Sequence, residues 1–99
     1  MSRWTEETGV SKRIRKRIME RDNGRCVLCW SGYGVQVAHA VPRSRGGRGI
    51  ETNLVLLCAV CHDRYDHTVR RPEMRDQIVE YLTDIYGEWE ERDQIYHKY

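Results

Sequence analysis

The sequence predicts a single small α+β domain, and three observations point to that fold class. The chain has 99 residues, which is the size of one domain. Two short strand patterns, at residues 35–41 and 54–57, lie between helical patterns. Hydrophobic residues make up only 39% of the chain, with no Phe, and charged residues make up 32%. We therefore expect a small core that needs a cross-link between its parts.

The four cysteines form two CxxC pairs, which predict a structural Zn²⁺ site. Cys26 pairs with Cys29, and Cys58 pairs with Cys61. A two-residue gap lets both thiolates bind one ion, and two pairs supply the four sulfur ligands that structural zinc prefers. A disulfide scaffold is an alternative, but the N-terminus carries no apolar signal segment. A thioredoxin-like redox motif is another, although it has one CxxC beside a βαβ pattern. We favour zinc.

The charge is distributed unevenly along the chain. Residues 1–48 carry eleven Lys and Arg against four Asp and Glu, whereas residues 49–99 carry six against eleven. A basic half is typical of proteins that bind phosphate groups, as in nucleic acids. A solvated helix face would also explain the cations at residues 12–17. No apolar run is long enough to cross a bilayer, so we expect a cytoplasmic protein with no membrane partner.

Three segments are expected in chain order: a flexible lead-in (residues 1–10), a main domain (11–71) and a helical C-terminal extension (72–99). In the main domain, Ser11 is the expected N-cap of a helix that ends at Asn23-Gly24. The strand at 35–41 should end at Pro42, and a flexible Gly-rich loop follows. The strand at 54–57 leads into a helix that begins near Ala59.

In the extension, Pro72 suits the first turn of a helix that runs to about Tyr86 and is broken by Gly87. Its apolar residues recur at helical spacing and are expected to lie on the core: Met74, Ile78, Leu82 and Ile85. The tail at 88–99 is acidic and aromatic, with Trp89, Tyr96 and Tyr99. A last helix, a docking surface and disorder all remain open for it.

Taken in order, these residues resemble the HNH endonucleases, whose ββα-metal unit is often cross-linked by two zinc knuckles. The segment from Ile14 to Cys29 resembles the family's lead helix and first knuckle. His39-Ala-Val-Pro42, followed by Arg-Ser-Arg-Gly-Gly47, resembles the base histidine and its loop. The segment from Asn53 to His62 resembles the central Asn and the closing Cys-His. The resemblance implies a ββα-metal domain with flanking N- and C-terminal helices.

The resemblance also implies an activity, that of a metal-dependent DNA endonuclease or nickase leaving 5′-phosphate and 3′-hydroxyl ends. His39 would be the general base and Asn53 would fix the loop. His62 would bind a catalytic divalent ion, Mg²⁺, Mn²⁺ or another, and Asp66 lies one helical turn later, where it can add a carboxylate ligand. Four arginines are expected to contact DNA: Arg43, Arg45, Arg48 and Arg64. Taken singly, His39 would also suit a half-buried structural role, and Asn53 a turn or cap.

One position departs from the family pattern. The residue before the base histidine is commonly Asp or His and binds the metal, but here it is Ala38. The alternative function is therefore a catalytically impaired zinc-stapled module that binds DNA or a protein. Small stand-alone members of the family are frequent in phages and bacteria. By that analogy the partner would belong to phage DNA packaging or to restriction, while the oligomeric state stays open.

Overall fold

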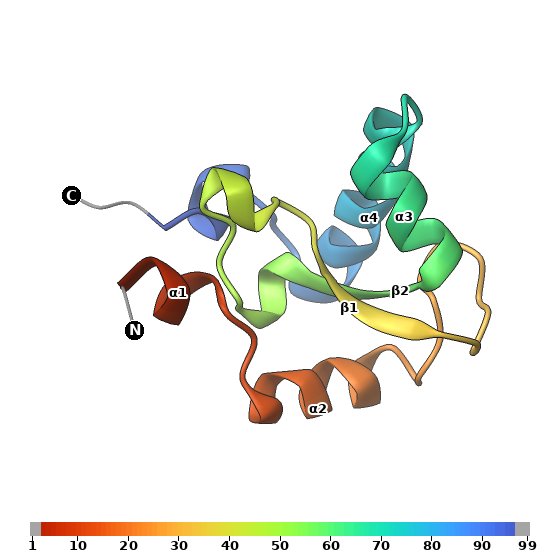
Figure 1. Cartoon of the computed structure of the whole chain (residues 1–99), viewed down its shortest axis with the longest axis horizontal. Helices are drawn as coiled ribbons and strands as arrows, with labels where there is room; N and C mark the ends of the chain where they lie inside the picture. Colours follow the sequence, from red (N-terminus) through yellow and green to blue (C-terminus); the bar gives the residue numbers. More distant parts are fainter. Residues whose placement is uncertain (1–2, 97–99) are drawn as a thin grey trace.

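A two-stranded antiparallel sheet lies at the centre of the computed structural model, which describes residues 3–96 (Figure 1). Strand β1 (Val35–His39) pairs with β2 (Leu54–Cys58), with His39 opposite Leu54. Helix α2 (Lys12–Arg21) covers one face of the sheet. Helices α3 (Ala59–His67) and α4 (Arg71–Tyr86) cover the other. The predicted α+β class is confirmed.

Strand β2 is buried along its whole length because both of its faces carry a core. Leu54 and Leu56 pack with Ile18 of α2. Val55 and Leu57 point the other way and belong to the larger cluster under α3 and α4. Side chains alternate between the two faces of a strand, so an uninterrupted apolar run is what a strand covered on both sides requires.

Helix α2 begins and ends where the sequence predicts. The Ser11 hydroxyl accepts a hydrogen bond from the Ile14 N–H at 3.1 Å, which caps the first turn. After Asp22 the chain reverses through Asn23 and Gly24, whose φ angles are 56° and 64°. Asn and Gly tolerate this left-handed conformation best, and the turn delivers the chain into the first CxxC pair.

A further helix, α1 (Arg3–Thr8), occupies the segment for which the sequence predicted a flexible lead-in. Thr8 is fully buried, and the Gly49 N–H donates to the Glu7 carbonyl at 2.9 Å. The segment has too few apolar residues to signal a helix by periodicity. It is held instead by contacts with a loop some forty positions further along the chain.

The C-terminal residues fold back on the Gly-rich loop. Helix α4 ends at Gly87, and its stripe packs through Leu82, whereas Ile85 on the last turn is 42% exposed, which corrects the prediction for that residue. The tail forms a short 3-10 turn, η3 (Glu91–Gln94). The Trp89 indole N–H donates to the Thr52 carbonyl at 2.6 Å, and the Tyr96 N–H donates to the Gly46 carbonyl at 2.7 Å. Tyr99 lies outside the described residues.

Along residues 3–96, no helix combines the length and the apolar character that crossing a bilayer requires.

Candidate active site and zinc centre

The four cysteines converge where the end of β2 meets the turn after α2. Their sulfur atoms all lie within 4.8 Å of one another, and those of Cys29 and Cys58 are 3.6 Å apart. Sulfurs bound tetrahedrally at about 2.3 Å lie roughly 3.8 Å from each other, so this cluster fits one zinc ion. All four thiols are free of disulfide bonds. The geometry agrees with the zinc prediction and not with a disulfide scaffold.

The thiols differ in their readiness to ionise. Burial opposes ionisation of Cys26, but backbone hydrogen bonds from Cys29 and Cys58 lower its pKa to about 7. Burial and the neighbouring thiols raise the pKa of Cys61 far above its ordinary value. Zinc binds thiolates, so an ion at this cluster would supply the positive charge that several adjacent buried thiolates need.

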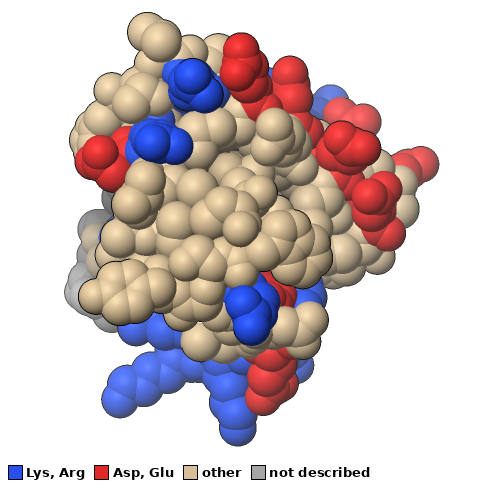
Figure 2. Space-filling view, turned by 90° about the vertical axis from the view of Figure 1, so that its right-hand side faces the viewer, with Lys and Arg blue, Asp and Glu red and all other residues tan. Residues whose placement is uncertain are grey.

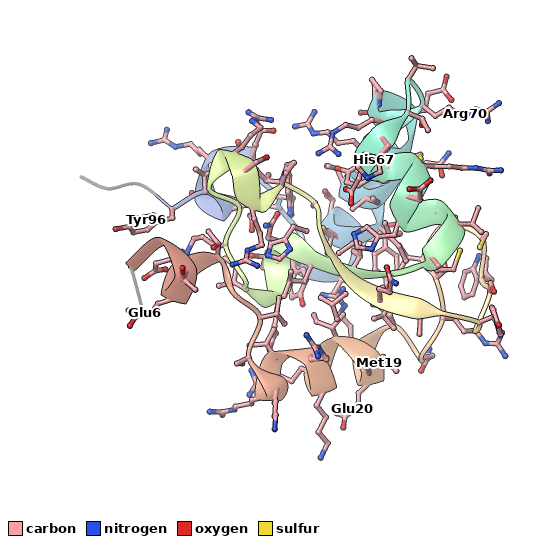
Figure 3. The ribbon with its side chains drawn as sticks, viewed as in Figure 1. Glu6, Met19, Glu20, His67, Arg70 and Tyr96 are labelled. Carbon is pink, nitrogen blue, oxygen red and sulfur yellow. The ribbon has the colours of Figure 1, made fainter. Side chains whose placement is uncertain are left out.

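A cleft of about 810 Å³ opens between β1, the loop after it and α3. The walls come from segments far apart in the sequence: the start of α2, the end of β1, the short 3-10 turn η1 (Arg43–Arg45), and helices α3 and α4. His67, which Figure 3 shows on α3, is one of the residues that line the cleft. Its charged and histidine side chains are Arg15, His39, Arg43, His62, Asp66, His67 and Arg71. Three arginines against one carboxylate make the cleft suitable for an anion.

His39 is held in one tautomer by helix α1. Its Nε2 lies 2.8 Å from the backbone carbonyl oxygen of Thr8. A carbonyl can only accept, so Nε2 carries the proton and Nδ1 is the basic nitrogen of the neutral ring. Burial, with smaller effects from Arg43 and His62, lowers the pKa of His39 below its usual 6.5. The ring is therefore neutral at pH 7 and able to accept a proton.

His62 is oriented by two neighbours on opposite sides of its ring. Its Nδ1 donates to the Gln36 side-chain oxygen at 2.6 Å, and its Nε2 lies 3.2 Å from a carboxylate oxygen of Asp66. With Nδ1 protonated, Nε2 of the neutral ring presents a lone pair to a carboxylate. Two facing lone pairs repel unless a cation stands between them, either a proton or a metal ion. The pair is thus a donor set suited to a divalent ion.

Asn53 locks the loop between the two strands. Its side-chain oxygen accepts from the Val41 N–H at 2.8 Å, and its amide donates to the carbonyls of Val41 and Arg48, the latter at 2.9 Å. The loop has little room to move, since a Cβ on Gly47 would lie 1.7 Å from the Val41 carbonyl oxygen. The Gly-rich segment is therefore a tightly packed corner and not the flexible loop that the sequence predicted.

The four arginines predicted to contact nucleic acid have different surroundings. Arg43 lines the cleft. Arg45 pairs with Glu91 of the tail at 3.7 Å, and Arg48 pairs with Glu7 of α1 at 3.4 Å. Arg64 is exposed on α3, outside the residues that line the cleft. Of the four predicted residues, the structure brings Arg43 alone into the cleft.

Sequence reasoning missed three groups at this site: the Thr8 carbonyl, the Gln36 side chain and Arg71. Arg71 lies over the Tyr65 ring at 4.1 Å and donates to the Tyr65 carbonyl at 2.8 Å. Gln36 lies three residues before His39 on the same strand, so the two side chains point to opposite faces and the spacing gave no signal of its role. Nothing in the local sequence signalled the other two groups.

Comparison with known proteins supports the assignment of the fold and the family. Residues 26–68 match the sequence model of the HNH endonucleases. Anaredoxin from Nostoc sp. is 27% identical over 55 residues, which cover 54% of this chain and 72% of the relative. The structure of the Type IV phosphorothioation-dependent restriction endonuclease ScoMcrA superposes with a TM-score of 0.69 at 16% identity. It covers 84% of this chain, which spans only 18% of that endonuclease.

The family resemblance is therefore confirmed over the segment that holds the cysteines and the cleft histidines. The structural neighbour adds evidence for the fold, since β1, β2 and α3 form the ββα arrangement that the resemblance implied. A match to this family supports nuclease activity in general.

Proposed function

We propose that this chain is a metal-dependent DNA endonuclease or nickase that hydrolyses phosphodiester bonds. The observation that carries the proposal is the single cationic cleft shared by His39 from β1 and His62 from α3. Hydrolysis of a phosphodiester needs a base for the attacking water, positive charge near the phosphate and groups that fix the geometry. The cleft offers candidates for all three.

His39 is the proposed general base. The Thr8 carbonyl accepts a hydrogen bond from the Nε2–H group of His39. Nδ1 is therefore the nitrogen that accepts the proton of the attacking water. Its lowered pKa keeps the ring unprotonated at neutral pH, ready for that transfer. Asn53 acts by positioning: its three hydrogen bonds fix the chain just after His39 and so limit movement of the ring.

His62 Nε2 and Asp66 are the proposed ligands of the catalytic divalent ion. Gln36 supports them from the other side of the ring by accepting the Nδ1 proton. When bound, such an ion stabilises negative charge on the phosphate oxygens. A mixed imidazole and carboxylate set favours Mn²⁺, Zn²⁺ or Ni²⁺ over Mg²⁺. Asp66 would thereby replace the metal ligand that the family commonly carries at the position of Ala38.

The arginines of the cleft are the proposed contacts to the DNA backbone. Arg15, Arg43 and Arg71 approach it from α2, η1 and α4. An arginine pairs with phosphate oxygens through two parallel hydrogen bonds, so three of them can fix a strand across the cleft.

A plasmid nicking assay with a series of divalent ions tests the proposal. We expect zinc-loaded protein to convert supercoiled plasmid to nicked or linear form, faster with Mn²⁺ than with Mg²⁺, because of the imidazole ligand. Asp66→Asn should weaken the apparent metal affinity roughly 10- to 100-fold. The matched control is Asp63→Asn on the exposed side of the same helix. Absence of cutting with every metal, on plasmid and on oligonucleotides, would contradict the proposal.

A second candidate function is a non-cutting module that binds DNA, favoured by the surroundings of Ala38. This residue is 1% exposed and belongs to the core cluster under α3. It lies on the same face of β1 as Gln36, which contacts His62. The usual ligand position has thus been converted into core packing.

Ala38→Asp separates the two candidates. In the enzyme, the new carboxylate should strengthen metal binding, raise the nicking rate at low metal and raise the melting temperature when Mn²⁺ is added. Without metal the variant should be less stable than the native protein, because a buried carboxylate lacks a partner. If neither protein cuts while both bind DNA in a salt-sensitive way, the binding module is the better description.

A further inference from the structure

A second groove, of about 400 Å³, continues from the cleft along the side of β1. The two spaces share Arg15, Val37 and His62, so they adjoin at these residues. Beyond those shared residues the groove is lined mainly by apolar side chains, from Met19, Val35 and Leu56. The two adjoining spaces thus differ in character: the cleft is cationic beside the histidines, and the groove is mainly apolar.

The groove wraps around the free edge of β1. Val35 and Val37 line it from one face of the strand, and Gln36 lines it from the other. Within residues 3–96 the sheet has two strands, so this edge of β1 has no strand partner. The edge therefore offers backbone N–H and C=O groups next to apolar side chains.

Met19 forms the outer wall of the groove. It is 40% exposed, on the last turn of α2, and Figure 3 shows it at the end of the helix that lies beneath β1. Figure 2 shows lysines and arginines gathered at the lower edge of the molecule, where α2 lies, below a largely uncharged face. An accessible apolar wall beside a basic helix is suited to a ligand that is anionic on one side and apolar on the other.

We propose that this groove binds an unpaired nucleobase next to the phosphate that is cut. The inference rests on the proposed function and specifies its substrate: single-stranded or locally unpaired DNA. In a duplex, each base is stacked and paired, and its faces are unavailable. An unpaired base offers an apolar face to Met19 and Val37, and polar edges to the free edge of β1. Arg15, at the junction, pairs with the connecting phosphate.

Binding measurements on a protein that cannot cut test this directly. We would use zinc-loaded His39→Ala protein at fixed salt, without added divalent ion. Fluorescence anisotropy would compare three probes: a short single strand, the same strand with abasic sites, and its duplex. The abasic strand keeps the phosphates and lacks the bases, so it isolates the contribution of the groove.

In this background we expect Met19→Glu to weaken binding of the single strand roughly tenfold, because the stacking surface is lost and a negative charge is introduced. Binding of the abasic strand should change much less. The matched control is Ile85→Glu, which changes an apolar side chain of similar exposure, 42%, outside the groove. It should affect the single strand and the abasic strand equally and weakly.

Three results would overturn the inference. Equal losses for Met19→Glu and Ile85→Glu would mean that only charge matters. Equal affinity for the single strand and its abasic form would mean that no base is bound. Gel filtration showing a dimer that Met19→Glu dissociates would mean that a second copy covers the groove. None of these three results bears on whether the protein nicks plasmid. Failure of the nicking assay alone would reject the proposed function, but it would not reject base binding in the groove.

Discussion

Replacing His39 with alanine is expected to lower the nicking rate roughly 100- to 10,000-fold, which is the usual contribution of a positioned general base. The side chain lies in the cleft with Nδ1 as its basic nitrogen, because the Thr8 carbonyl holds the Nε2 proton. The measurement is the initial rate of plasmid nicking at saturating metal. Melting temperature and zinc content should be measured alongside, so that a folding defect is recognised.

His67→Ala is the matched control, since it removes another histidine of the same cleft. The His67 ring is exposed, and its nearest acidic partner is Asp63 at 4.0 Å, on the same helix. We expect a change of no more than a few-fold. Equal losses for the two variants would show that His39 contributes charge and not proton transfer, and would contradict its assignment as the base.

The pH profile provides an independent test of the same residue. Burial lowers the pKa of His39 below 6.5, and the neutral ring is the active form. The rate should therefore be constant around pH 7 and fall as the pH drops, with a midpoint on the acid side of 6.5.

Removal of zinc is expected to unfold the domain. Binding of structural zinc contributes about 10–16 kcal/mol in small domains, which matches or exceeds a whole-domain stability of about 5–15 kcal/mol. The ion would join the turn after α2 to the junction of β2 and α3, and three of its four cysteines lie in the larger core cluster, so its loss would open that cluster. Circular dichroism with a strong chelator should show loss of helix and of cooperative melting.

Cys58→Ser should reproduce the effect of the chelator, and added zinc should reverse the chelator but not the substitution. The control is Ser31→Ala, which removes a hydroxyl two residues after Cys29, beside the other knuckle, and takes away no sulfur ligand. If a reductant alone, with zinc retained, caused the loss of structure, disulfides would be the cross-link and the zinc centre would be rejected.

The parts of this protein that could be predicted are those encoded by neighbouring residues. Ser11 and Asn23-Gly24 mark the ends of α2 by local hydrogen bonding and backbone preference. The CxxC pairs define a metal centre because two close cysteines have few other uses in such a chain. The spacing of His62 and Asp66 on one helix places their side chains together, at 3.2 Å.

The parts that could not be predicted depend on contacts between distant segments. Helix α1 has no periodic signal, yet it supplies the carbonyl that fixes His39. The sequence predicts that Arg48 is a cation of the Gly-rich loop available to DNA. In the structure it pairs with Glu7, which is far away in the sequence. Arg71 is the first residue of α4, and the sequence around it predicts only a helix start. The turn that joins α3 to α4 places its side chain in the wall of the cleft.

The anchoring of the loop after β1 has a consequence for the energetics of association. The Asn53 side chain from one side, and the backbone groups of Gln94 and Tyr96 from the other, hold that loop by hydrogen bonds to its backbone. Arg43 is thus presented by a segment whose conformational freedom was already lost on folding. A polyanion docking there would have little chain entropy to remove, so tail truncation should slow association and speed dissociation even though residues 88–96 are not among those that line the cleft.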